Sequence, residues 1–230
     1  MANNYYDMTG VLKLNTVTPV IKALFGSLEL DASQPGNGEV YIAEVAEQTD
    51  CSWDAIYSSL DDLAKEVKAV NSGSFESIDI VLLALADYLK SPYVERLTRV
   101  IDSANFAEHA SLDELFEIAQ CLDDGHGLQA IRTEAARHCD QSRLFAFGGS
   151  GRYLGKHFAH RIASEEIHQL GPELDTLLAA GELGSAAIRI SKQVESLLAG
   201  VVDPGQREEL RAKLFPRADV DSEAGGDRSK

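Results

Sequence analysis

Asp123, Asp124 and His126 fall within four consecutive positions of a glycine-containing turn, Asp123-Asp-Gly-His-Gly127. Carboxylates and imidazole suit a divalent metal ion, and they also suit general acid and base catalysis. The same residues fit the end of a helix, because glycine readily takes the left-handed conformation that terminates one. A metal-dependent enzyme centred on this turn is therefore one hypothesis. A helix terminus with solvated side chains is the other, and we favour it.

Other pairs with reactive side chains are separated by strand geometry. His138 and Cys139 offer a base and a thiol, but adjacent residues of a strand point to opposite faces. The run Gly148–Gly151 has the glycine content of a phosphate-binding loop, yet it lacks the Lys-Ser/Thr pair of a P-loop and precedes a strand pattern. We interpret it as a hairpin turn. We assign no catalytic residue, expect no cofactor, and favour a protein that is not an enzyme.

Positive charge is concentrated between residues 128 and 162. This segment holds 6 Lys and Arg against 2 Asp and Glu, whereas residues 1–127 hold 7 against 22 and residues 163–230 hold 8 against 13. Sheets that bind single-stranded nucleic acid combine basic and stacking aromatic side chains on one face. This alternative nucleic-acid-binding surface would consist of Arg132, Arg152, Tyr153, Lys156, His157 and Arg161.

An acidic helix face is the preferred candidate for binding a partner. The chain has a formal net charge of −16, which repels nucleic acid and attracts a basic protein surface. From Trp53 to Val67, apolar residues recur at helical spacing and leave charged residues mostly on the opposite side. The expected partner-binding residues are Asp54, Asp61, Asp62 and Glu66. Solubility is the competing explanation for this acidity.

The periodicities that position these residues predict an α+β protein with two small antiparallel sheet units. Strands are expected over residues 5–14, 39–46, 128–138 and, on either side of the glycine turn, 144–146 and 153–162, with a further turn at 31–38. Helices are expected at about 19–28, 53–67, 77–89, 93–101, 112–122, 165–170, 173–180, 183–198 and 204–214. The apolar residues of the last four helices are expected to be buried against the sheets.

The expected organisation has five parts: an N-terminal α+β unit (1–70), a helical linker (71–110), a second α+β unit with the hairpin (111–163), a helical segment (164–215) and a disordered tail (216–230). Cys51, Cys121 and Cys139 show no metal-ligand or disulfide spacing, so we expect buried, reduced thiols. The start of the chain lacks a signal-peptide pattern and no apolar run reaches membrane-spanning length. These features favour a cytoplasmic protein with no membrane partner.

Four segments carry a family resemblance: MANNYYDMTGVLKLNTVTPVIKALFG, PGNGEVYIAEVAE, LDDGHGLQAIRTEAARHC and RLFAFGGSGRYLGKH. They resemble uncharacterised accessory proteins of bacterial integrative and conjugative elements and plasmids. The resemblance implies no catalytic residue. It implies a small cytoplasmic protein of a mobile element, where many accessory proteins bind and block host defence complexes. Its partner would then be a host or element-encoded protein.

Overall fold

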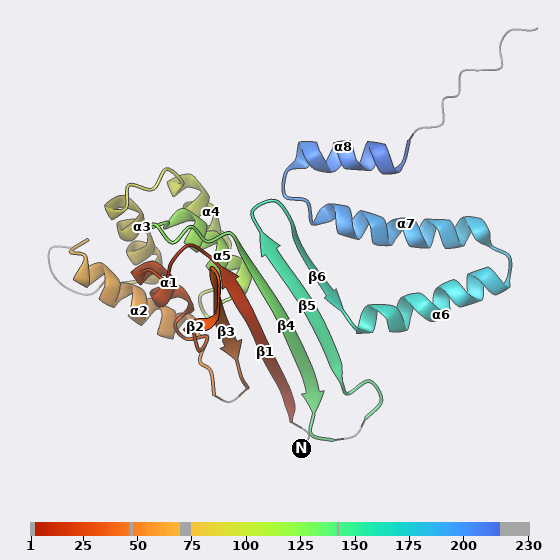
Figure 1. The fold of residues 1–230 in the computed structure, drawn as a ribbon, viewed down its shortest axis with the longest axis horizontal. Helices are drawn as coiled ribbons and strands as arrows, with labels where there is room; N and C mark the ends of the chain where they lie inside the picture. Colours follow the sequence, from red (N-terminus) through yellow and green to blue (C-terminus); the bar gives the residue numbers. More distant parts are fainter. Residues whose placement is uncertain (1–2, 47, 70–74, 142, 217–230) are drawn as a thin grey trace, which may run out of the picture.

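The computed structural model of the protein describes residues 3–46, 48–69, 75–141 and 143–216. One six-stranded antiparallel sheet crosses the molecule, and three helices project from its last strand as an arm (Figure 1). The strands are β1 (Asn4–Lys13), β2 (Asp31–Gly36), β3 (Glu39–Glu44), β4 (Ala130–Cys139), β5 (Gly148–Gly155) and β6 (Ala159–Ala163). The predicted α+β class is confirmed.

The strands expected in two units form a single sheet in the order β2-β3-β1-β4-β5-β6. The reason is that β1 pairs with β3 along one edge and with β4 along the other, so that Leu12 lies opposite both Val40 and Ile131. Gly10 lies at the centre of this three-strand contact. A Cβ atom there would lie 2.3 Å from the carbonyl oxygen of Arg132, so only glycine permits this close approach.

Among the described residues, five helices pack on part of one face of the sheet and three form the arm. They are α1 (Pro19–Phe25), α2 (Trp53–Glu66), α3 (Ile78–Tyr88), α4 (Val94–Ser103), α5 (Leu112–Cys121), α6 (Glu165–Ala179), α7 (Leu183–Ala199) and α8 (Pro204–Leu214). The predicted helix starts are confirmed at several points. Thr18 caps α1 ahead of Pro19, and Ser111 and Glu114 form a reciprocal capping box at the start of α5.

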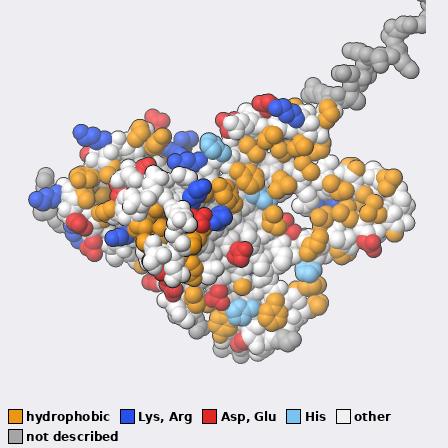
Figure 2. Space-filling model, in the orientation of Figure 1, with side chains coloured by type: hydrophobic (Ala, Val, Ile, Leu, Met, Phe, Trp, Pro, Cys, Tyr) orange, Lys and Arg blue, Asp and Glu red, His pale blue; other side chains and the backbone are white. Residues whose placement is uncertain are grey.

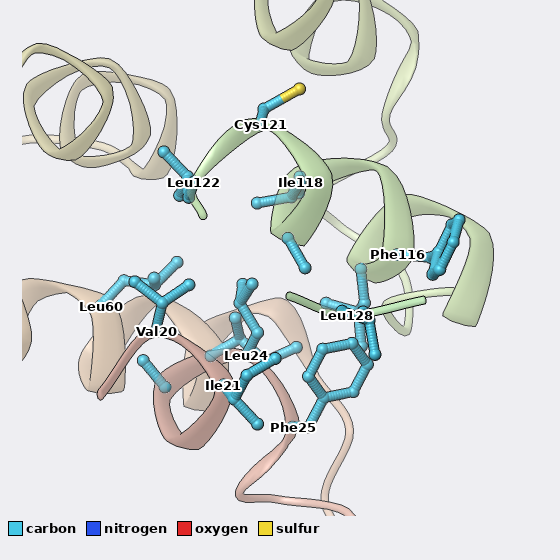
Figure 3. Close-up of a cluster of buried hydrophobic side chains, with 14 of the residues drawn as sticks. Val20, Ile21, Leu24, Phe25, Leu60, Phe116, Ile118, Cys121, Leu122 and Leu128 are labelled. Carbon is cyan, nitrogen blue, oxygen red and sulfur yellow. The ribbon is translucent and has the colours of Figure 1, made fainter. Parts of the chain in front are cut away.

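The hydrophobic core lies between the sheet and the first five helices. Alternate residues of β1, such as Met8 and Leu12, point into it, and α1 contributes Ile21 and Leu24. Figure 3 shows how α1, α2 and α5 meet there, with Leu128 at the entry to β4 among them. Residues of α3 and α4 belong to the same core. Cys51, Cys121 and Cys139 are buried and unpaired, as expected.

The expected hairpin turn at Gly148–Gly151 is wrong. These glycines belong to β5, where Gly149 and Gly151 lie opposite Ala136 and Glu134 of β4, and the turn falls at Lys156 and His157 instead. Glycine favours a turn only when no neighbouring strand compensates its flexibility, and here β5 pairs on both sides. Similarly, the segment Asp31–Gly36 forms the irregular edge strand β2 in place of the expected turn.

The arm also departs from expectation. α6 is one helix that continues through Pro172, where two helices were expected. The apolar residues of the arm were expected to pack on the sheet, yet among the described residues 165–214 only Ala186 and Leu198 are buried. The arm is attached at Ser164, where it begins, and at the α7–α8 junction, Gly200–Val202, and it extends away from the helix layer (Figure 1).

Two expected segments lie outside the described residues: most of the boundary near 71–76 and the tail after residue 216. Within the described part of the chain, the helices are too short or too polar to cross a lipid bilayer.

Candidate interaction surface

His126 is buried and its ring is fully engaged by the backbone. Nδ1 accepts the N–H of Leu128 at 2.8 Å, which requires that this nitrogen carry no proton, and Nε2 donates to the carbonyl oxygen of Ala119 at 3.1 Å. The imidazole therefore joins the last turn of α5 to the start of β4. A metal ion or a substrate at Nδ1 would displace the Leu128 hydrogen bond.

The neighbouring carboxylates of Asp123 and Asp124 also accept hydrogen bonds from other parts of the chain. Asp124 accepts the Thr18 hydroxyl and the Val20 N–H, so it caps α1 from a distant part of the chain. Burial would raise the pKa of the Asp123 carboxyl, but hydrogen bonds from the Gly127 and Gly125 amides, together with the positive charge of Lys156, outweigh it and lower the pKa.

Ligand atoms of Asp123, Asp124 and His126 do come within 4.8 Å of one another. However, His126 Nδ1, Asp123 Oδ1 and both carboxylate oxygens of Asp124 already accept hydrogen bonds from the protein, so a metal ion would compete with these bonds. The arrangement supports a helix terminus that also fixes the start of α1, but the expectation of solvated side chains is wrong for His126, which is buried.

The proposed acidic face of α2 retains three of its four residues. Asp54, Asp62 and Glu66 are exposed, whereas Asp61 is only 7% exposed. Asp61 accepts the N–H of Phe75 at 3.2 Å and the Lys65 ammonium at 2.6 Å. Because it joins α2 to the segment before α3, Asp61 is a structural residue and does not belong to the exposed face.

The six residues of the basic surface do not share one face. Register places Tyr153 opposite Arg132 and His160, while Arg152 lies opposite Thr133 and Arg161 on the other side of the sheet. Lys156 and His157 occupy the turn. One strand was expected over residues 153–162, with Tyr153, His157 and Arg161 on one face. The turn at Lys156 and His157 divides that segment into β5 and β6, so Tyr153 and Arg161 lie on opposite faces.

Two of these arginines are also paired with carboxylates. Arg132 lies 2.6 Å from Glu39 of β3, and Arg152 forms an ion pair with Asp113 at the start of α5. Burial lowers the pKa of the Arg152 guanidinium, and the nearby Arg161 adds to this effect. The basic side chains are therefore divided between two faces and partly neutralised, which weakens the case for a phosphate-binding strip.

The sheet face that the first five helices leave uncovered has a different character. Thr9, Val11, Tyr41, Arg132 and Tyr153 form the floor of an open hollow of about 730 Å³, whose side wall includes Phe158 and Leu197. We call this hollow the outer trough. Its lining is predominantly apolar, and Arg132 lies in it beside Tyr153.

A second hollow of about 540 Å³ continues the outer trough beneath the arm. Ile162 and Leu197 line both hollows, and Ile167 and Leu170 of α6 complete the second one. The apolar surface therefore runs from β3 across the sheet to the arm. Figure 2 shows hydrophobic side chains gathered over the arm on one face of the molecule.

Sequence reasoning missed this surface because it assigned the arm's apolar residues to a core. Ile162 on the edge strand β6 is 57% exposed directly before the arm begins, and nothing in its local sequence distinguishes it from a buried strand residue. Comparison of the chain with protein-family models, with curated proteins and with solved structures gave no match.

Proposed function

We propose that the protein is a non-enzymatic binding module that holds an amphipathic segment of a basic partner protein in the outer trough. The observation that carries this proposal is the open apolar hollow on the uncovered sheet face, floored by Val11, Tyr41 and Tyr153. Exposed apolar surface that is continuous and rimmed by polar residues is characteristic of protein-binding sites.

The chemistry of the partner follows from the two properties of the surface. Apolar side chains of the partner fill the outer trough, and basic residues on its flanks are attracted by a chain whose net charge is −16. Asp54, Asp62 and Glu66 contribute to that field from α2. They act at long range, which speeds encounter more than it strengthens the complex.

The family resemblance suggests where such a partner would be found. An acidic module of a mobile element would bind a basic host or element-encoded protein, and a nucleic-acid-binding subunit of a host defence complex has the required charge. Inhibition would then result from occupying that subunit's surface. The hydrogen bonds that Asp124 and His126 make within the protein favour this proposal over the metal-dependent enzyme.

A peptide-display selection tests the proposal on the protein alone, because the peptide library supplies the candidate partner segments. Random 16-residue peptides are selected on the intact protein, and the winners are measured against Tyr153→Asp and Tyr88→Asp. Tyr153 lies in the trough and is 40% exposed, and Tyr88 on α3 is 49% exposed outside it, so the two changes are matched in exposure.

We expect apolar residues at helical or alternating spacing with Lys or Arg at the flanks, and binding lost only in Tyr153→Asp. Equal binding by both variants would contradict the proposal. If peptides fail and a labelled single-stranded oligonucleotide binds with a steep salt dependence that Arg132→Ala removes, the nucleic-acid alternative replaces it.

A further inference from the structure

The arm carries a second apolar feature, which the outer trough does not explain. Along α7, apolar side chains recur at alternating intervals of four and three residues: Leu183, Ala187, Ile190, Val194 and Leu197. This is the spacing of a seam between packed helices. Within this series Leu183, Ile190 and Leu197 are 68%, 51% and 46% exposed.

α6 carries a matching series at Ile167, Leu170, Leu174 and Leu177. Ile167 and Leu170 line the same hollow as Leu197 of α7. The start of the α6 series and the end of the α7 series therefore lie on the same side of the α6–α7 hairpin. Ile167 is 61% exposed, and the remaining three are half-buried. The hairpin therefore presents the apolar row of α7 to solvent, with the partly covered row of α6 beside it.

The hairpin is held in shape by polar contacts away from these rows. Gly181 has φ of +71° at the turn, a conformation that favours glycine, and Arg189 of α7 lies 2.5 Å from Glu173 of α6. On the other side, Arg211 of α8 donates to both carboxylate oxygens of Glu195. A preformed pair of helices with one uncovered apolar face is half of a four-helix bundle.

We propose that two copies of the chain associate through this face, so that their α6–α7 hairpins form a four-helix bundle about a two-fold axis. A two-fold interface requires a surface that complements itself, and an antiparallel hairpin with two similar apolar rows meets that requirement. This inference goes beyond the proposed function because it concerns the arm, and Leu197 is the one residue that its apolar rows share with the outer trough.

Charge selects the second copy over an unrelated helix. α6 has four acidic residues and no Lys or Arg, whereas α7 has Arg189 and Lys192 against Glu195. Crossing the hairpins by a two-fold rotation places α6 of one copy against α7 of the other, which joins a helix of charge −4 to one of charge +1. Like helices would repel if α6 met α6, so this arrangement is favoured.

Sedimentation equilibrium of the full chain tests the proposal with two matched substitutions. Ile190 lies in the apolar row of α7, while Ile188 is two residues away, about 200° around the helix, and is 63% exposed. We expect a dimer for the wild type and for Ile188→Glu. Ile190→Glu should raise the dimer dissociation constant at least about 100-fold, because it buries an unpaired charge at the interface.

A monomeric wild type, a larger open assembly, or equal effects of the two substitutions would overturn the proposal. Circular dichroism of each variant shows whether it retains its fold, and Leu183→Glu provides a second row position if Ile190→Glu does not. Tyr153→Asp should leave the dimer intact. A failure of peptide binding and a failure of dimerisation can therefore be recognised separately.

Discussion

The body of the protein, which is its described part up to residue 163, and the arm, α6–α8, both contain amphipathic helices but differ in what covers them. In α1, five of the seven residues are buried, and α2 and α5 bury their stripes against the same core. α6 and α8, all of whose residues are described, bury none. The difference is the presence of a sheet face opposite the helices of the body.

An apolar stripe therefore indicates that one face of a helix is to be buried. It does not show whether the same chain or another molecule buries that face. In the body the same chain supplies the cover, through β1, β3 and β4. In the arm the chain supplies only part of it, so the stripes of α6 and α7 are available to another molecule. The proposed roles of the protein, both as a binding module and as a dimer, follow from this unequal cover.

The largest expected difference between body and arm is in the free energy of unfolding that Leu60→Ala and Leu183→Ala remove. Leu60 of α2 is fully buried, so its truncation should cost about 2 to 5 kcal/mol of the free energy of unfolding. Leu183 is 68% exposed, and its truncation should change the stability of the monomer by less than about 0.5 kcal/mol. Urea denaturation measures both changes, at a protein concentration too low for the dimer to form. Similar losses of stability in the two variants would mean that the arm has a core of its own.

A second expected effect concerns His126→Ala. The substitution leaves the Leu128 N–H and the Ala119 carbonyl without partners in a buried site, which should cost about 2 to 4 kcal/mol. Because we assign the ring a structural role, zinc or magnesium ions should leave the melting temperature of the wild type unchanged. Stabilisation by either metal that disappears in Asp123→Asn would restore the metal-site hypothesis.

A smaller change in stability tests whether Asp61 is a structural residue and Asp62 a surface residue. Asp61→Asn should lose about 1 to 3 kcal/mol, because the Asp61 carboxylate accepts the Phe75 N–H and the Lys65 ammonium in a nearly buried position. Asp62→Asn alters an exposed neighbour and serves as the control, with a change within about 0.5 kcal/mol. The reverse order in chemical denaturation would show that Asp61 belongs to the surface after all.

Much of the body could be predicted from the sequence because its signals are local. The helix starts at residues 19 and 112 and the strand over residues 5–14 each depend on neighbouring residues, and each is confirmed. The joining of the strands into one sheet could not be predicted, since it depends on Leu12 meeting both Val40 and Ile131 across long separations.

The candidate surface was harder to predict than the fold. Tyr153 and Arg152 are adjacent in sequence and lie on opposite faces, and their faces depend on the register of β5 against β4. The exposure of Leu183 and Ile190 depends on the absence of a covering element in the described part of the chain. Periodicity shows that such residues need cover, and it cannot show whether the chain itself supplies it.

The smallest effect at neutral pH concerns Cys51, whose burial raises the pKa of its thiol to about 12. At pH 8 almost none of it is thiolate, so iodoacetamide should modify Cys51 only after urea unfolds the body. A raised pKa also means that the contribution of Cys51 to stability is complete below about pH 9 and is lost as the pH rises toward 12. Rapid labelling of Cys51 in the folded protein, detected by mass spectrometry, would contradict its burial.

Hydrogen–deuterium exchange as a function of protein concentration tests the central claim most directly, which is that the body buries its own helices whereas the arm depends on a second copy. Amides of β1, α2 and α5 should be equally protected in concentrated and dilute samples, because the body covers its own core. Amides of α6 and α7 should be protected in the concentrated sample and should exchange quickly on dilution, as the second copy dissociates. If the arm remained as protected as the body at every concentration, the account would be wrong.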